Sequence, residues 1–216
     1  MNTDYARLQM VNQQVRGWNV YDDDVLAMLG QLPREHFVPE EFSSLAFADI
    51  ALPIGHGEFM MTPTIEGRLL QALSLDGDEN VLEIGTGSGF MTACLAQLAS
   101  HVTSIDIYDD FVESAANKLA AEEIANVELL QMDATQELPE AQFDAIAVTG
   151  SIQSFDPRFV EALSPHGRLF VVVGDGPAMQ ARLIERTEEH DWQTVSLFET
   201  ELAPLVHGAR PPQFSF

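Results

Sequence analysis

The sequence predicts a doubly wound α/β domain with a mostly parallel sheet, an N-terminal helical section and a C-terminal antiparallel hairpin. Two observations carry this prediction. From about residue 80 onward, short apolar runs rich in Val, Ile and Leu alternate with helix-like segments, a pattern typical of parallel strands buried on both faces. The first of these runs leads into a glycine-rich turn at residues 85–89, the position at which folds of this class bind ligands.

The N-terminal section, residues 1–62, is predicted to be helical first and irregular later. Apolar side chains recur at helical spacing over residues 4–18, and a second helix is expected over 22–31. Irregular chain follows. Thr62 and Pro63 then have the residue types of an N-cap and of a first helical position, so a new helix is expected to begin there.

Alternating elements are expected in the rest of the chain. The predicted strands are residues 80–85, 101–107, 127–132, 143–148 and 167–174. The predicted helices between and after them are residues 89–99, 109–123, 155–163 and 177–189. The tail, residues 192–199 followed by 201–206, reads as a closing antiparallel hairpin.

The charge of the chain excludes some classes of partner. Its 216 residues are 46% hydrophobic, which is enough for a sizeable core, but 34 acidic residues face only 10 basic ones, for a net charge of −24. Such a chain repels phosphate backbones and anionic membranes, so neither nucleic acid nor a membrane surface is expected as a partner. Two interpretations stay open: an ordinary acidic protein, or adaptation to a saline setting, which the single lysine, Lys118, favours.

The location and assembly of the protein are expected to be simple. A single cysteine, Cys94, cannot form an internal disulfide, and no apolar run approaches the roughly 18–20 residues that span a bilayer. A cytoplasmic protein is therefore expected, with a monomer as the default. The six histidines lack the spacing of metal ligands, so no metal site is expected.

The stretch "VLEIGTGSGF" favours one nucleotide cofactor over another. The dinucleotide fingerprint G-x-G-x-x-G fails here because phenylalanine occupies its third glycine position, and the spacing of Gly85, Gly87 and Gly89 is G-x-G-x-G instead. Glu83, just before the turn, would repel a pyrophosphate and attract a cation. S-adenosyl-L-methionine carries a sulfonium, an ammonium and no phosphate, so the loop predicts this cofactor.

Two further acids are expected to contact the same cofactor. Asp106 ends the second predicted strand, where a carboxylate can bind both ribose hydroxyls, although dinucleotide enzymes use the same arrangement. Asp133 ends the third strand and is expected to accept a hydrogen bond from the adenine amino group. A solvated strand end is the alternative for Asp106, and Asp109 and Asp110 are expected to cap a helix. The predicted cofactor-binding set is Glu83, Gly85, Thr86, Gly87, Ser88, Gly89, Asp106, Asp133 and Ala134.

Several motifs together resemble one known family. They are "MVNQQVRG" (10–17), "LPREHFVPEEF" (32–42), "AFADIALPIGHGE" (46–58), "VLEIGTGSGF", "FDAIAVTGS" and "LSPHGRLFVVVG" (163–174). In this order they resemble the protein-L-isoaspartate O-methyltransferases. The resemblance implies a seven-stranded, Rossmann-like methyltransferase fold over the single domain 1–216, divided at residue 62 into a helical and substrate-loop section and a cofactor-binding core, 63–216. It also implies S-adenosyl-L-methionine as methyl donor and an isoaspartyl carboxylate in an aged peptide or protein as acceptor.

One loop departs from the pattern of that family. The family usually reads G-Q-T-I-S-Q-P, with a serine tied to activity, whereas this chain reads "GEFMMTP", which places Met61 at the serine position. A carboxylate acceptor with a pKa near ~4 is already ionised at pH 7 and needs no general base, so catalysis would be mainly alignment and exclusion of water. The catalytic residue is therefore left open, with Met61, Thr62 and His56 as candidates; His56 would act as a base only on a hydroxyl or thiol.

Three functions are compatible with these residues. The first is isoaspartyl O-methylation. The second is methylation of a different, more apolar acceptor, including an unidentified small molecule, at the same cofactor site. The third is binding of S-adenosyl-L-methionine without catalysis.

Overall fold

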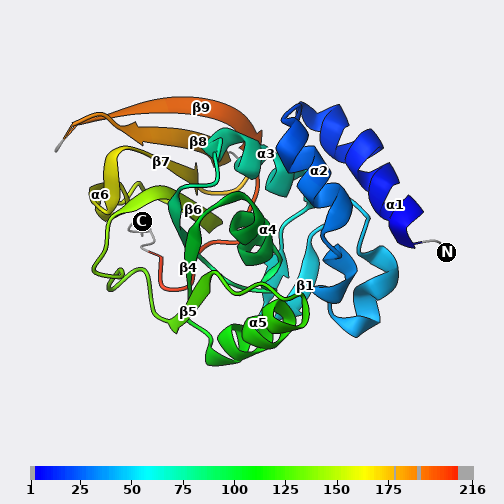
Figure 1. Cartoon of the computed structure of the whole chain (residues 1–216). Helices are drawn as coiled ribbons and strands as arrows, with labels where there is room; N and C mark the ends of the chain where they lie inside the picture. Colours follow the sequence, from blue (N-terminus) through cyan, green and yellow to red (C-terminus); the bar gives the residue numbers. More distant parts are fainter. Residues whose placement is uncertain (1–2, 178, 189–190, 209–216) are drawn as a thin grey trace, which may run out of the picture.

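A seven-stranded sheet forms the centre of the structure, a computed structural model that describes residues 3–177, 179–188 and 191–208. The strands, in chain order, are β3 (Asn80–Ile84), β4 (His101–Asp106), β5 (Val127–Gln131), β6 (Phe143–Ile152), β7 (Leu163–Val173), β8 (Met179–Arg186) and β9 (Trp192–Thr200). Their spatial order is β5-β4-β3-β6-β7-β8-β9, and Figure 1 shows β5 and β9 at the two edges. The first five strands are parallel, and β8 is antiparallel to both β7 and β9.

The order of the strands creates a crevice in the middle of the sheet. The chain begins centrally with β3, moves outward through β4 to β5, and then returns to the other side of β3 to form β6. Connections on the two sides of this switch point leave in opposite directions, so a space opens at the carboxyl ends of β3 and β6. The predicted parallel core is confirmed, and the functional site is expected at this edge.

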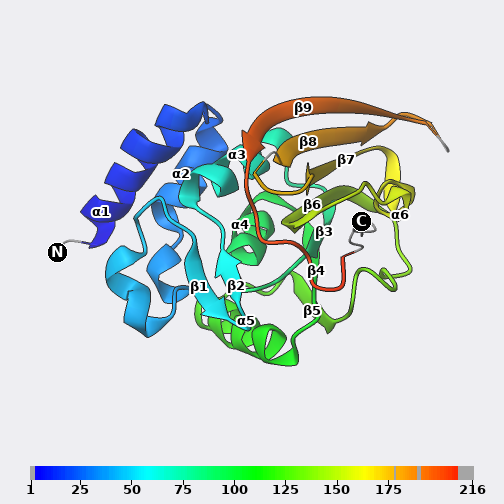
Figure 2. The same cartoon turned by 180° about the vertical axis from the view of Figure 1, so that it is seen from behind.

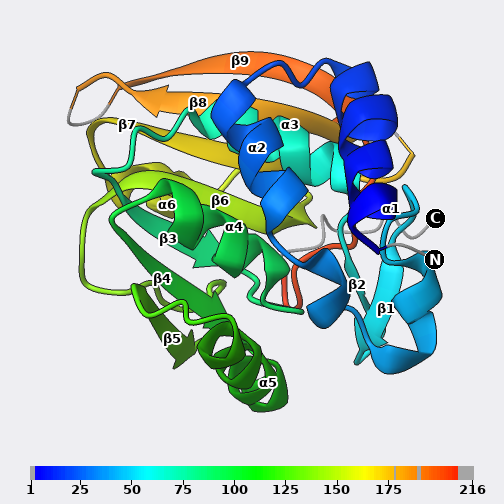
Figure 3. The same ribbon diagram turned by 45° about the vertical axis from the view of Figure 1, so that its right-hand side comes forward.

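Helices cover one face of the sheet more fully than the other. The helices α3 (Pro63–Leu73), α4 (Phe90–Leu98) and α5 (Asp109–Ala121) share a core with Val81, Val102 and Ala145 of the strands. The opposite face packs against the short helix α6 (Pro157–Glu161) and neighbouring loops. Figure 3 shows α3, α4 and α5 from the side that they cover.

The N-terminal section packs beside α3 and α4 and carries a small hairpin. Its elements are α1 (Thr3–Gln9), which continues as a π-helical turn (Met10–Val15) and a 3-10 turn (Arg16–Trp18), then α2 (Asp23–Gln31), two 3-10 turns (Arg34–His36 and Glu40–Leu45), β1 (Leu52–Gly55) and β2 (Glu58–Met60). The antiparallel β1–β2 pair lies where the sequence predicted irregular chain. The predicted start of α3 is confirmed, because Thr62 is its N-cap and Pro63 its first residue.

The prediction for the C-terminal part was wrong in two respects. Residues 177–189 were expected to be helical, yet they contain strand β8; residues 192–199 pair with β8 and not with residues 201–206. Ala, Met, Gln, Arg, Leu and Glu in this segment are good helix formers, but its residues are buried on both faces of the sheet, with Met179 and Ala181 in one core and Ile184 in the other. Tertiary burial therefore overrides local propensity, and the only local signal of a strand is the apolar–polar alternation of residues 179–183, which ends at the adjacent Leu183 and Ile184.

Candidate cofactor and acceptor site

A cavity of about 620 Å³ lies at the carboxyl ends of the central strands. The glycine turn after β3, the ends of β4 and β5, the β1–β2 hairpin and residues 201–206 supply its walls. Figure 2 shows the hairpin next to α5, on the side from which it borders the cavity. The cavity thus joins the predicted cofactor residues to the predicted substrate loop.

The glycine turn has the backbone that its sequence requires. Gly85, Gly87 and Gly89 have φ values of 101°, 50° and 83°, in the left-handed region that residues with a Cβ atom rarely adopt. At Gly85 a Cβ atom would lie 2.3 Å from the Thr149 hydroxyl oxygen. That hydroxyl donates to the carbonyl oxygens of Ile84 and Gly85, so it holds the turn against β6.

Glu83 lies behind the glycine turn and does not line the cavity. Side chains alternate along β3, so Ile84 faces the cavity while Glu83 points toward α4, where its Oε2 accepts hydrogen bonds from Thr92 (2.5 Å) and Ser104 (2.6 Å). Burial raises its pKa to about 8, so the group is mainly protonated at neutral pH. This placement corrects the expectation that Glu83 attracts the cofactor directly.

Glu83 is nevertheless connected to the turn. The hydroxyl oxygens of Ser104 and Thr86 lie 2.6 Å apart, so a hydrogen-bonded chain runs from Glu83 through Ser104 to the glycine turn. The second oxygen of Glu83, Oε1, is buried and has no hydrogen-bond partner among the described residues. Glu83 therefore supports the turn from below.

Asp106 lines the cavity and is oriented by backbone groups. Its Oδ2 accepts from the Gly87 N–H at 2.8 Å, and its Oδ1 accepts from the Tyr108 N–H at 3.0 Å. Burial raises the pKa of Asp106 above its ordinary value, while these backbone N–H groups act in the opposite direction. Asp106 thus lines the cavity with a carboxylate that backbone N–H groups hold in place; its contact with a ribose stays a prediction.

Asp133 and Ala134 line the adjacent part of the cavity, after the end of β5. Asp133 Oδ1 accepts from the Thr135 N–H (2.9 Å) and hydroxyl (2.6 Å), and Oδ2 lies 2.9 Å from His207 Nδ1. Burial opposes ionisation of Asp133, but the hydrogen bonds from His207 and Thr135 outweigh it and hold the pKa of Asp133 below its ordinary value. Asp133 is therefore an ionised acceptor at neutral pH.

His56, the candidate base, is placed outside the cavity lining. It sits at the tip of the β1–β2 hairpin, stacks on the Tyr108 ring with centroids 4.0 Å apart, and lies edge-on to Phe111. Its Nε2 is 2.8 Å from Asp110 Oδ2 at the start of α5, and this hydrogen bond lowers the pKa of Asp110. His56 thus fastens the hairpin to α5 and does not line the cavity, and its role as a candidate base stays a prediction.

The side of the cavity formed by residues 59–61, in the predicted substrate loop, is apolar. Met60 and Met61 are buried and line it, together with the half-exposed ring of Phe59. Thr62 also lines the cavity, but its hydroxyl lies 3.5 Å from the Ile65 N–H as the cap of α3 and 3.0 Å from the Thr64 hydroxyl. The hydroxyl of Thr62 is therefore engaged with the helix that it caps.

Arg34 is a buried residue that sequence reasoning missed. It is fully buried and donates from Nε to the Ala46 carbonyl (2.9 Å), from Nη2 to the Met61 carbonyl (2.8 Å) and from Nη1 to the carboxylate of Glu66. Its guanidinium also lies over the Phe90 ring, 4.7 Å from the centroid. Arg34 thereby links Met61, which lines the cavity, to Phe90 at the start of α4. No local pattern signals this link, because these partners are distant from Arg34 in the sequence.

The charged side chains that line the cavity are all acidic. Glu58, Glu66, Asp106, Asp133, Asp175 and Glu201 line it, and the residues that the structure describes there include no Lys, Arg or His. Burial raises the pKa of Glu66 to about 7, while Arg34 acts in the opposite direction. Burial and the nearby Asp106 also raise the pKa of Glu58. Such a wall favours a ligand with net positive charge.

Residues 201–206 form a wall that sequence reasoning assigned to a hairpin. The Ser151 N–H donates to the Ala203 carbonyl, the Leu205 N–H donates to the Ser151 carbonyl, and the Ser151 hydroxyl donates to the Leu202 carbonyl. This segment therefore runs along the end of β6, where it borders the cavity.

The described residues contain neither a metal-binding cluster nor a helix that could span a membrane. Within residues 3–177, 179–188 and 191–208, no group of three or more His, Cys, Asp or Glu side chains has the arrangement to hold a metal ion. A helix that combines the length and the apolarity needed to cross a membrane is not found in the described part of the chain.

Comparisons with known proteins agree on one family. The model of the family Protein-L-isoaspartate(D-aspartate) O-methyltransferase (PCMT) matches residues 6–210. The chain is 39% identical over 202 residues to Protein-L-isoaspartate O-methyltransferase 1 of Rhodopseudomonas palustris (strain HaA2), covering 93% of this chain and 82% of the relative. It is 33% identical over 205 residues to Protein-L-isoaspartate O-methyltransferase of Aliivibrio salmonicida (strain LFI1238), covering 94% and 98%.

A solved structure shares the fold. It is described as a protein-L-isoaspartate O-methyltransferase beta-aspartate methyltransferase (PCMT) from Plasmodium falciparum in complex with S-adenosyl-L-homocysteine. It superposes with a TM-score of 0.79 over 92% of this chain and 97% of the other, at 20% sequence identity. At this identity the likeness shows the fold, and it confirms the predicted seven-stranded Rossmann-like methyltransferase architecture.

Proposed function

The chain belongs to the protein-L-isoaspartate(D-aspartate) O-methyltransferase family, and from this premise we propose that it methylates isoaspartyl carboxylates of peptides or proteins, with S-adenosyl-L-methionine as donor. Beyond family membership, one observation supports S-adenosyl-L-methionine as the donor. The wall of the cavity is acidic, without a basic side chain among its described residues, and it is built around a glycine turn at the carboxyl ends of the central strands. A sulfonium and an ammonium suit such a wall, and a pyrophosphate does not.

The residues present fit this cofactor. Gly85, Gly87 and Gly89 allow the backbone to approach a ligand closely. Asp106 would accept hydrogen bonds from the ribose hydroxyls, and Asp133 from the adenine amino group, with Ala134 beside it. Thr86 and Ser88 complete the turn, and Glu83 supports it from behind. When bound, S-adenosyl-L-methionine supplies an electrophilic methyl group.

The protein's own part in the reaction is alignment and exclusion of water. An isoaspartyl carboxylate is ionised at neutral pH, so no side chain has to remove a proton from it. Met60, Met61 and Phe59 form an apolar wall that displaces water from the acceptor side, which strengthens the electrostatic interactions inside the cavity. Arg34 holds the carbonyl of Met61 and thereby positions this wall.

An assay on a matched pair of peptides tests the proposal. One peptide contains isoaspartate and its control contains aspartate at the same position; only the isoaspartyl peptide is expected to gain a base-labile methyl ester. S-adenosyl-L-homocysteine should inhibit the reaction and bind in calorimetry. Binding without methylation of either peptide would reject the proposed acceptor and leave a cofactor-binding protein or a different acceptor.

A second candidate function is methylation of a more apolar acceptor. The observation that favours it is the wall of Met60, Met61 and Phe59, in which Met61 stands where the family pattern has serine. A screen of neutral acceptors, followed by transfer of labelled methyl groups from the donor, separates the two candidates.

We also propose a partner, a location and an assembly state for the protein. A peptide or protein is the proposed partner, since a net charge of −24 disfavours nucleic acid and anionic membranes. We propose the cytoplasm as its location, which the unpaired, fully buried Cys94 supports, and a monomer of one domain as its working form.

A further inference from the structure

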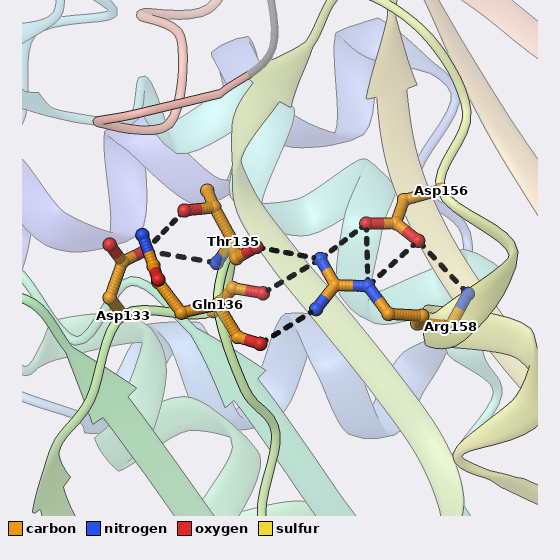
Figure 4. Close-up of polar contacts among 6 residues, drawn as sticks. Asp133, Thr135, Gln136, Asp156 and Arg158 are labelled. Atoms are coloured by element: carbon orange, nitrogen blue, oxygen red, sulfur yellow. Dashed lines mark hydrogen bonds and ion pairs between the residues drawn. The ribbon is translucent and has the colours of Figure 1, made fainter.

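An arginine outside the cavity holds the loop that carries Asp133. Arg158, on helix α6, donates from Nη2 to the carbonyl oxygens of Thr135 (3.0 Å) and Ala134 (3.4 Å), and from Nη1 to that of Gln136 (3.2 Å). Figure 4 shows the guanidinium between this loop and Asp156. Three successive backbone carbonyls are thus bound by one side chain.

Asp156 fixes the guanidinium from the other side. Its Oδ2 accepts from Arg158 Nη2 at 2.6 Å and from Nε at 3.1 Å. Oδ1 also caps the start of α6 by accepting from the Arg158 N–H at 3.0 Å. Only a planar fork with several donors in fixed directions can bind a carboxylate and three carbonyls at once, so this position requires arginine.

The loop of residues 133–136, which Arg158 holds, determines the direction from which Asp133 can accept a hydrogen bond. A carboxylate offers about four lone-pair positions. Thr135 occupies both positions on Oδ1 through its N–H and hydroxyl, and His207 occupies one on Oδ2. One position on Oδ2 remains. Its direction depends on the backbone that follows Asp133, and Arg158 holds this backbone through the carbonyls of residues 134–136.

We propose that Arg158 is a positioning residue for the adenine end of the cofactor site, which it orders by holding loop 133–136 so that the remaining lone pair of Asp133 faces the adenine amino group. The inference rests on the proposed function, because it uses the predicted contact between Asp133 and adenine. It goes beyond that function because it assigns selectivity for adenine to a residue that does not line the cavity.

Calorimetry with two ligands tests the inference. In S-inosyl-L-homocysteine an oxygen replaces the amino group and the adjacent ring nitrogen N1 gains a proton, so the base presents an acceptor at the position where S-adenosyl-L-homocysteine would donate to Asp133. The wild-type protein is expected to bind S-adenosyl-L-homocysteine about 10- to 150-fold more tightly, the affinity equivalent of one charge-assisted hydrogen bond. In Arg158→Gln this ratio should fall toward one, mainly because S-adenosyl-L-homocysteine binds less tightly.

Two further variants make the test specific. Arg158→Lys keeps the charge but not the fork, so an intermediate ratio is expected. Arg168→Gln is the matched control, since Arg168 also binds a loop carbonyl (Ser74, 2.8 Å) and a carboxylate (Glu79, 3.0 Å) but does not line or border the cavity. Its ratio should equal that of the wild type.

Several outcomes would overturn the inference. Equal weakening of both ligands in Arg158→Gln would show that Arg158 only stabilises the fold, and an unchanged ratio would show no role at this site. Wild-type protein that does not discriminate between the ligands would remove the contact of Asp133 with adenine, and the inference with it. If Arg158→Gln does not fold, Arg158→Lys decides in its place: a lowered ratio supports the inference and an unchanged ratio rejects it. Failure of the wild-type protein to bind either ligand would instead reject the proposed function.

Discussion

Glu83 illustrates at the scale of a residue how burial changes the chemistry of a side chain. It is fully buried behind the glycine turn, and burial raises its pKa from 4.5 to about 8. The folded protein therefore holds a proton there that the unfolded chain has released between these two pH values. The stabilising contribution is complete below pH 4.5 and is lost as the pH rises toward 8.

We expect Glu83→Gln to remove this pH dependence. Relative to the variant, the free energy of unfolding of the wild type should fall by on the order of 1.4 kcal/mol per pH unit within this window. Urea titrations of both proteins at mildly acidic, neutral and mildly alkaline pH measure the difference. A constant difference across this range would show that Glu83 titrates normally in the folded protein.

Gly87 provides a second test at the scale of a residue. Its φ is 50°, and an added Cβ atom would lie 3.1 Å from Ile54 Cδ1 at the cavity wall. Gly87→Val is therefore expected to abolish binding of S-adenosyl-L-homocysteine in calorimetry while the protein stays folded.

Gly77→Val is the matched control for Gly87. Gly77 also has a positive φ, 99°, but a Cβ atom there would meet nothing within 4 Å, and Gly77 does not line the cavity. This variant should bind as the wild type does. Binding of NADH without binding of S-adenosyl-L-homocysteine by the wild type would reject the assignment of the turn.

At the scale of elements, the β1–β2 hairpin and the start of α3 form the acceptor wall together. Met61 is buried between them, its carbonyl is held by Arg34, and the hydroxyl of Thr62 caps α3. Thr62 therefore does not supply a free hydroxyl in place of the one that the family pattern has in this loop.

We expect isoaspartyl methylation by the wild type to be slow and Met61→Ser to raise kcat/KM. A restored hydrogen bond to an ionised carboxylate is equivalent to roughly 10- to 150-fold in rate. A further variant, Glu58→Gln/Phe59→Thr/Met60→Ile/Met61→Ser, restores more of the loop and retains Thr62, because the N-cap is worth about 1 kcal/mol.

Met60→Ser is the control for this position. Met60 is as buried as Met61 and is its direct neighbour, so a general loosening of the loop would affect both variants alike. Wild-type turnover equal to that of Met61→Ser would contradict the idea that the loop has moved away from the isoaspartyl reaction.

At the scale of the whole molecule, the net charge of −24 is the dominant feature. Like charges repel one another across the folded surface, and dissolved salt screens this repulsion over a Debye length of about 8 Å at physiological ionic strength. We expect the melting temperature to rise between low and moderate NaCl or KCl. A neutral osmolyte at equal osmolality is the control, and a melting temperature that does not respond to salt would remove the idea of a saline setting.

The predictions that held concern residues whose signal is local. The parallel strands were recognised because each is a short segment with Val, Ile or Leu that alternates with helix-like segments, and α3 because Thr62 and Pro63 are adjacent in sequence. Asp106, Asp133 and Ala134 line one cavity because the carboxyl ends of parallel strands meet at one edge of the sheet. Their contacts with the cofactor stay predictions.

The sequence by itself determined the fold class, the place of the cavity and the acidity of its surroundings, since local periodicity, turn chemistry and charge decide these. Only the tertiary structure decided that residues 179–186 form a strand, that Glu83 lies behind the turn, and that His56 lies outside the cavity. It also decided that Arg34 and Arg158 hold the two loops that border the site. Each of these outcomes depends on burial or on partners distant in the chain, and a local pattern contains neither.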